Sequence, residues 1–276
     1  MKLNNFWTRI ISGIGLIIIT FGLFYAGPWG LAIFATIIAV IGMHEFFNLV
    51  GIEDANIRNL SMLSNGGLTL AYASNDYVFG QYLSIGIFSF IVAHLVYLWR
   101  MDKVSFKFVL RAHIYLTLPM QLLQINARDL AGHYDFMIPL FLMVLVWSSD
   151  SWAYVSGKLL GKHKLAPSIS PGKTWEGLIG GSILTAVTAY YFSYFLLSQP
   201  SPDGEGLWFH ETWTPIYSIF LGLLVAVLGT MGDLFASSLK REAGVKDSGN
   251  LIPGHGGILD RFDAFIFAIF VMNLLG

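Results

Sequence analysis

The sequence contains no cysteine and few charged residues: only 12% of its 276 positions are Asp, Glu, Lys or Arg, against about a quarter in soluble domains. Without cysteine, disulfides, thiolate nucleophiles and cysteine-ligated metals are excluded. A formal net charge of −1 argues against a nucleic-acid partner, because proteins that bind nucleic acids present basic surfaces. An intrinsically disordered chain is excluded too, since it would need many charges and few apolar residues.

Hydrophobic residues are abundant and make up 55% of the chain. A helix needs roughly 20 apolar residues to cross a bilayer, and runs of that length predict an all-α integral membrane protein, a polytopic bundle of about nine transmembrane helices. The weaker run at 104–125 carries basic residues, and its alternative structure is a helix that lies in the membrane interface without crossing the bilayer. The clear spans are 10–25, 29–50, 82–99, 136–154, 177–197, 216–235 and 258–275, and the weaker ones are 60–73 and 104–125.

Basic residues give the orientation. Lys2 and Arg9 precede the first apolar run as in a signal peptide, but no small-residue cleavage site follows, so we expect an uncleaved helix. With nine spans and a cytoplasmic N-terminus, most of the 16 lysines and arginines fall on the cytoplasmic side. Residues 198–213 form an expected outer loop whose charges are all acidic. The compact chain and the lack of a targeting extension predict a bacterial inner membrane.

Polar residues are distributed unevenly along the chain. We expect residues 1–132 to form N-terminal transmembrane helices that mostly face lipid, and residues 133–276 to form a catalytic transmembrane region. The second part contains two long basic cytoplasmic loops, 156–176 and 237–257, that are rich in Gly, Ser, Lys and Asp. No internal repeat of the kind common in transporters is visible.

Four aspartates, Asp150, Asp233, Asp260 and Asp263, lie near cytoplasmic ends of predicted helices. Each one alone can be an ordinary carboxylate at a helix end. Asp260 and Asp263 suit the start of a helix, because negative charges there interact favourably with the helix dipole. Together they would repel one another unless a cation lay between them. Mg²⁺ is held by one or two carboxylates and by phosphate oxygens. The cluster, beside basic loops, therefore predicts a Mg²⁺ site that serves a phosphate substrate.

The first basic loop has the residue types that bind phosphate. Glycine lets backbone N–H groups approach closely, lysine supplies charge, and hydroxyls supply hydrogen bonds. The spacing is not that of a Walker P-loop. A positive-inside loop or attraction to anionic lipid explains Lys158, Lys162 and Lys164 equally well. Function is favoured for Ser170, Lys173 and Thr174. Thr174 and Glu176 come just before the helix expected at 177, whose N-terminus favours anions.

The second basic loop follows a helix that Lys240 and Arg241 extend. Lys240 shares a helix face with Asp233, two turns earlier. Glycines around His255 allow unusual backbone angles and close approach to a ligand. Three roles stay open for His255: a general base, a hydrogen-bond donor to a phosphate, or a structural histidine. Arg261, in an apolar helix, needs a partner, and a lipid phosphate is one candidate.

Residues 237–263 resemble the signature of the phosphatidate cytidylyltransferase (CDP-diacylglycerol synthase) family. The shared elements are a serine followed by an apolar residue and Lys-Arg, then Lys-Asp, then His-Gly-Gly, and finally Asp-Arg-x-Asp, at matching spacing. The runs at 170–177 and 150–154 are similar to two further family features, and Glu45-Phe46 to a weaker one.

The resemblance implies an enzyme that converts CTP and phosphatidate, at the cytoplasmic face of the membrane, into CDP-diacylglycerol and pyrophosphate for phospholipid biosynthesis. It implies Mg²⁺ on Asp233 and Asp260, with Asp150 at the metal or the nucleotide, and it allows a second, monovalent cation such as K⁺. It is also compatible with a homodimer. The catalytic residues would be Asp233, Asp260, Lys240 and Arg241, and the substrate-binding residues Asp150, Ser170, Lys173, Thr174, Glu176, Lys246, Asp247, His255, Gly256, Gly257 and Arg261.

Two alternatives stay open at this point. A CTP-dependent polyprenol or phytol kinase would share the cluster but transfer the γ-phosphoryl group and release CDP. A cation-coupled transporter would also use carboxylates within spans. The transporter is disfavoured because the charges gather at one surface and no site at the membrane midplane is visible.

Overall fold

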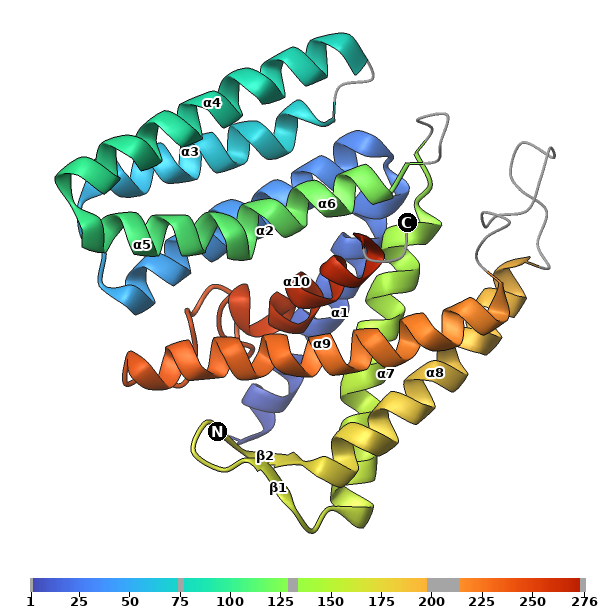
Figure 1. Cartoon of the computed structure of the whole chain (residues 1–276). Helices are drawn as coiled ribbons and strands as arrows, with labels where there is room; N and C mark the ends of the chain where they lie inside the picture. The colour runs from blue at the N-terminus through green and yellow to red at the C-terminus, as the bar shows by residue number, and fades with distance from the viewer. Residues whose placement is uncertain (1, 74–76, 129–133, 198–213, 274–276) are drawn as a thin grey trace. The chain divides into compact units, whose positions relative to one another are not determined.

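The computed structural model describes residues 2–73, 77–128, 134–197 and 214–273, and these are almost entirely helical (Figure 1). Six helices are long and apolar enough, by length and composition, to cross a membrane. This confirms the all-α membrane class, while the count of nine spans stays a prediction. The six helices are α1 (Lys2–Tyr25), α2 (Pro28–Val50), α4 (Tyr77–Met101), α7 (Met137–Leu160), α8 (Trp175–Leu197) and α9 (Pro215–Glu242).

The other predicted spans are also helical but shorter. α3 (Ala55–Ala71) covers the weak run at 60–73, and α10 (Leu259–Asn273) covers the described part of the final run. The run at 104–125 forms α5 (Lys103–Ala112), a π-helical turn η1 (His113–Thr117) and α6 (Leu118–Asn126). Whether these segments cross the membrane stays a prediction, as does the outer loop at 198–213, which lies outside the described residues.

Local sequence sets several helix boundaries. Pro28 occupies the first turn of α2, where its missing N–H costs nothing, and the helix ends at Gly51, which adopts a left-handed φ of 72°. Asp54 caps α3 by accepting backbone N–H bonds from Asn56 and Ile57. Asp102 caps α5 in the same way.

The first basic loop is more ordered than predicted. α7 continues to Leu160, beyond its expected end at residue 154, and an antiparallel hairpin follows: β1 (Lys164–Ala166) pairs with β2 (Ser170–Thr174). The prediction of one loop over 156–176 is therefore wrong. The helix extends beyond its apolar run. Lys158 in the last turn stabilises this extension, because a positive charge there interacts favourably with the negative end of the helix dipole. Likewise, α9 runs to Glu242, so the loop expected from 237 begins after that residue.

Large apolar side chains are exposed on several spanning helices. On α1, Ile11 is 68% and Ile18 is 65% exposed; on α4, Ile85 is 61% exposed. Soluble monomers rarely leave so much apolar surface open to water. These helix faces are suited to contact lipid.

The chain divides into two compact units that interleave along the sequence. Unit 1 comprises residues 1–125 and 239–262, and unit 2 comprises residues 126–238 and 263–276. Helices α9 and α10 contribute residues to both units. The functional division at residue 132 stays a prediction.

In unit 1, α2 is the most buried of the spanning helices and carries a row of fully buried alanines. A side chain at Gly42 would lie 3.1 Å from both Leu116 and Leu259, so the glycine lets η1 and the start of α10 pack closely on α2. The ring of Phe34 meets Phe262 edge-on, with centroids 5.5 Å apart. These contacts place the start of α10, which follows the second basic loop, against α2.

In unit 2, small residues let the helices approach closely, as is common between membrane helices. A Cβ on Gly181 of α8 would lie 2.9 Å from the Cα of Ala153 on α7. One on Gly222 of α9 would lie 2.8 Å from the Cα of Ala186 on α8. This packing holds α7, α8 and the hairpin between them in one arrangement.

Candidate active site

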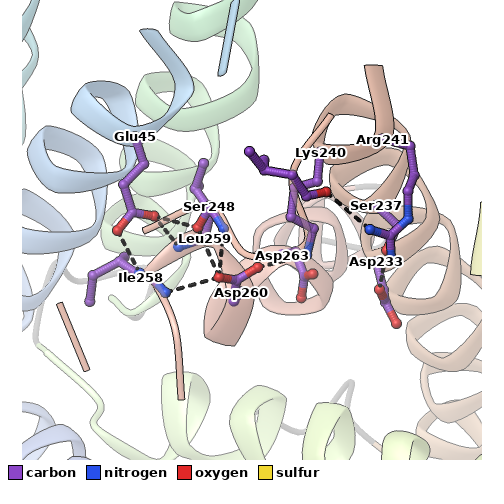
Figure 2. A network of polar contacts seen from close by, with 12 residues as sticks. Glu45, Asp233, Ser237, Lys240, Arg241, Ser248, Ile258, Leu259, Asp260 and Asp263 are labelled. Atoms are coloured by element: carbon purple, nitrogen blue, oxygen red, sulfur yellow. Dashed lines mark hydrogen bonds and ion pairs between the residues drawn. The ribbon is translucent and has the colours of Figure 1, made fainter. Parts of the chain in front are cut away.

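Asp260, in the first turn of α10, is the centre of the polar network in unit 1 (Figure 2). Its Oδ1 accepts a hydrogen bond from Lys240 Nζ at 2.6 Å. Its Oδ2 accepts bonds from the backbone N–H groups of Ser248 at 2.8 Å and Gly257 at 2.9 Å. The Asp260 side chain is only 4% exposed, and that of Lys240 is 11% exposed. Such a buried charge pair is tolerated because hydrogen bonds satisfy the remaining oxygen lone pairs.

A second buried carboxylate, Glu45 of α2, organises the same loop. It accepts hydrogen bonds from Ser248 Oγ at 2.7 Å and from the backbone N–H groups of Ile258 at 2.9 Å and Leu259 at 3.0 Å (Figure 2). It therefore caps the start of α10, where free N–H groups and the helix dipole favour a negative charge. Sequence reasoning noted Glu45 only as a weak family feature and left it out of the site. A carboxylate inside an apolar run is the signal that identifies it.

Glycines at 256 and 257 fit the close approach that was predicted, but what approaches is the protein's own carboxylates. Gly256 has a φ of 85°, and a Cβ there would lie 2.6 Å from Asp260 Oδ2. A Cβ on Gly257 would overlap Ser248 and Glu45. These glycines shape the loop around Asp260 and Glu45.

The remaining predicted residues of unit 1 lie around this centre. Arg241 is exposed and donates to the carbonyl of Val245 at 3.0 Å. Lys246 and Asp247 are exposed in the loop. His255 is partly buried, and its Nδ1 lies 2.8 Å from Ser12 Oγ on α1; Arg261 is exposed.

Unit 2 contains a second carboxylate–lysine pair. Asp233 of α9 accepts a hydrogen bond from Ser237 Oγ at 3.1 Å and pairs through Oδ2 with Lys173 Nζ at 2.6 Å. Both partners of the pair are partly exposed. A predicted phosphate-binding lysine of the first loop is thus in contact with a predicted metal ligand.

The hairpin that carries Lys173 is fixed to α8 by two predicted site residues. Thr174 is buried, and its Oγ1 accepts the backbone N–H of Gly177 at 3.1 Å. Glu176 accepts the backbone N–H groups of Lys162 and His163 at 3.1 Å each and contacts the His163 ring at 2.5 Å. In this arrangement Thr174 and Glu176 position the hairpin, and Ser170 pairs opposite Ala166 at the start of β2.

Two predicted carboxylates have different surroundings. Asp150 is exposed on α7 and, because the helix continues to Leu160, lies about 15 Å before the helix end, at 1.5 Å per residue. The expectation that it lies next to a helix end is therefore wrong. Asp263 is 8% exposed and accepts the backbone N–H of Ala264 at 2.8 Å, in keeping with a residue of the helix start.

The carboxylates described here suit Mg²⁺ only when substrate oxygens complete the coordination shell of the ion. Among the described residues, no group of three or more His, Asp or Glu side chains could hold a metal ion. Asp233 and Asp260 each contact a lysine ammonium, which supplies some of the positive charge that the carboxylates need. Mg²⁺ commonly takes only one or two carboxylates and completes its shell with water and substrate phosphates. Two aspartates beside lysines suit that mode better than an all-protein cage.

The fold and these networks define an integral membrane protein with carboxylate–lysine pairs suited to phosphate chemistry. Residues 7–276 match the model of the cytidylyltransferase family, and the chain belongs to this family. It is 34% identical to the phosphatidate cytidylyltransferase of Staphylococcus haemolyticus over 272 residues, which cover 97% of each chain. It is also 34% identical over 276 residues to that of Staphylococcus aureus strain COL, again covering 97% of each chain. It is 45% identical to the Bacillus subtilis enzyme of the same name over 146 residues, which cover 52% of this chain and 49% of that protein.

Proposed function

We propose that this protein is a membrane phosphatidate cytidylyltransferase that converts CTP and phosphatidate into CDP-diacylglycerol and pyrophosphate in phospholipid biosynthesis. Its relatives of that name match it over 97% of their length. The structural observation that carries the proposal is the convergence of signature residues on one carboxylate: Lys240, Ser248 and Gly257 all donate to Asp260. Bacterial relatives and the basic loops favour an active site on the cytoplasmic face of the inner membrane.

The reaction needs little proton chemistry from the protein. An oxygen of the phosphatidate phosphate attacks the α-phosphorus of CTP, and the bond from that phosphorus to the pyrophosphate oxygen breaks. The attacking oxygen is already anionic near neutral pH, so no strong general base is required. As in other phosphoryl transfers, catalysis then depends on positioning and on stabilising negative charge.

Positive side chains would perform most of that stabilisation. Lys240 and Lys173 are held in place by their carboxylates. Their ammonium groups would donate to phosphate oxygens. Arg241 and Lys246 are exposed and available to the triphosphate. Ser170 and Thr174 belong to the hairpin proposed to bind the nucleotide, and Glu176 holds that hairpin in position.

Asp233 and Asp260 would hold the magnesium ion, and Asp150 would contribute to the metal or the nucleotide. The family signature and the preference of Mg²⁺ for carboxylate oxygens support this assignment. Mg²⁺, when bound, neutralises charge on the CTP phosphates and on the departing pyrophosphate. A second, monovalent cation such as K⁺ and a homodimer formed through the helices are further parts of the proposal.

The test is an assay of the detergent-solubilised protein with phosphatidate, CTP and Mg²⁺, in which pyrophosphate and lipid product are both measured. We expect pyrophosphate and CDP-diacylglycerol in equal amounts. Both products should be lost on addition of EDTA and strongly reduced in Asp260→Asn. Asp102→Asn is the matched control, because Asn preserves the helix cap that Asp102 provides. Release of CDP with a phosphorylated prenol would instead indicate a kinase. Absence of nucleotide turnover in folded protein would refute the proposal.

A further inference from the structure

Two segments far apart in the sequence, the start of α1 and the stretch 255–261, meet at a positively charged cluster in unit 1. We call it the Arg9 cluster and define it as Arg9, His255 and Arg261. Arg9 lies near the start of α1, His255 in the loop before α10, and Arg261 in the first turn of α10. Both arginines are exposed and His255 is partly buried. Nothing in the reaction described above uses Arg9.

The contacts between α1 and the loop hold this cluster together. Ser12 Oγ donates to the carbonyl of Pro253 at 3.0 Å and lies 2.8 Å from His255 Nδ1. Gly254 has a φ of 76°, and a Cβ built on it would lie 2.9 Å from Arg9 Cγ. The aliphatic part of Arg9 is therefore packed against the turn, while its guanidinium remains at the surface.

The cluster has an excess of positive charge. Among the described residues, no carboxylate forms an ion pair with Arg9 or Arg261. Burial and the positive charges of Arg261 and Arg9 lower the pKa of His255 below its ordinary value. Arg261 follows His255 by only six residues, in the first turn of the helix that this loop enters. Cations held together in this way are stabilised by a shared anion, and guanidinium groups bind phosphate oxygens in bidentate fashion.

The position of Arg9 favours a lipid as the source of that phosphate. Arg9 lies within the first turns of the spanning segment Trp7–Tyr25, and Trp7 beside it is 56% exposed. Tryptophan at the end of a membrane helix marks the headgroup level, and arginine there reaches toward the interface. A lipid phosphate lies at that same depth.

We propose that the Arg9 cluster binds the phosphomonoester headgroup of the lipid substrate, and that Arg9 is a substrate-binding residue. The proposal rests on the proposed function for the identity of that lipid. It separates the substrates: the lipid phosphate binds the Arg9 cluster, and the nucleotide phosphates bind the lysines described above.

The test uses the full-length protein in detergent with two arms. The first measures binding of phosphatidate in mixed micelles without CTP, with phosphatidylglycerol, a phosphodiester, as the comparison lipid. The second measures KM for phosphatidate and for CTP separately. The variants are Arg9→Gln and Arg9→Lys, with Arg100→Gln as the matched control, since Arg100 is an exposed arginine at the end of another spanning helix.

We expect Arg9→Gln to weaken phosphatidate binding and to raise KM for phosphatidate by roughly tenfold, the loss of one charge-assisted contact. KM for CTP should stay within about twofold, and Arg9→Lys should recover part of the loss because the charge remains without the fork geometry. Arg100→Gln should change neither value. If CTP is not turned over but Arg9→Gln still loses phosphatidate binding, the cluster stands and the proposed reaction fails.

Three results would overturn the assignment of the Arg9 cluster. One is phosphatidate binding that is unchanged in Arg9→Gln. Another is a rise confined to the KM for CTP, which would place the triphosphate there. The third is an equal loss in Arg100→Gln or an equal loss of phosphatidylglycerol binding, which would indicate general attraction to anionic lipid.

Discussion

Glu45 and Ser248 are joined by a 2.7 Å hydrogen bond across 203 positions of sequence. Through it, the second membrane helix fixes the loop that carries the family signature. Ser248 also donates its backbone N–H to Asp260, so one residue connects the two buried carboxylates of unit 1.

Glu45→Gln should destabilise the protein by about 1–3 kcal/mol, because the amide nitrogen would face a donor and leave buried N–H groups unsatisfied. The unfolding temperature in detergent, measured as the loss of enzyme activity on heating, reports this change in stability. Glu53→Gln serves as the control, since Glu53 is exposed after α2. An unfolding temperature equal to that of the wild type would show that Glu45 does not hold the loop.

Lys240→Met should be strongly destabilising, by about 3 kcal/mol or more, because it leaves the buried Asp260 carboxylate without its cation. The double variant with Asp260→Asn should be more stable than Lys240→Met alone, since the unpaired charge is then removed. A double-mutant cycle of unfolding free energies measures this coupling. Additive effects would mean that the pair is not coupled in solution.

Lys173→Ala should raise the apparent KM for CTP more than that for phosphatidate. The reason is that Lys173 extends from the hairpin proposed to bind the nucleotide. Steady-state kinetics with each substrate varied in turn measures the ratio. Lys164→Ala, an exposed lysine on the partner strand, is the matched control. Equal effects of Lys173→Ala on both substrates would argue against nucleotide contact.

Asp233→Asn and Asp260→Asn should each raise the Mg²⁺ concentration needed for half-maximal activity, because each removes a proposed carboxylate ligand. Titration of residual activity with Mg²⁺ measures the shift, and EDTA should abolish activity of the wild type. Asp102→Asn should titrate as the wild type does. If both variants keep the wild-type Mg²⁺ dependence, the metal is held elsewhere.

His255 should reduce stability as the pH falls. Its pKa is lowered in the folded protein, so the unfolded chain binds the proton first, and stability is lost as the pH decreases through the ordinary histidine value of about 6.5. The difference in unfolding temperature between wild type and His255→Gln should therefore change in favour of His255→Gln between about pH 7.5 and 5.5. A constant difference across that range would show that the surroundings of His255 do not disfavour its charge.

Sequence periodicity predicts the helices well, because a long apolar run in a membrane protein has few other structures available. It predicts the partners of charged residues less well. Lys240 shares a helix face with Asp233 as the spacing predicts, yet its ammonium bonds Asp260, while Asp233 pairs with Lys173. These pairings depend on how loops return, and helical spacing carries no information about that.

The sequence does not reveal the hairpin or the partners of Glu45, for physical reasons. Strands as short as Lys164–Ala166, next to Pro and Gly, have the composition of a loop. Glu45 bonds two backbone N–H groups, and these donors exist at almost any residue, so no sequence pattern reveals the match.

Glu45 has a consequence for the order of assembly. The ribosome produces this carboxylate early, and its backbone partner at Ile258 emerges 213 residues later. Until α10 has been synthesised, the carboxylate lacks the backbone N–H groups of Ile258 and Leu259, and the signature loop lacks this anchor on α2. Enzyme activity should therefore appear only after the start of α10 has reached Glu45.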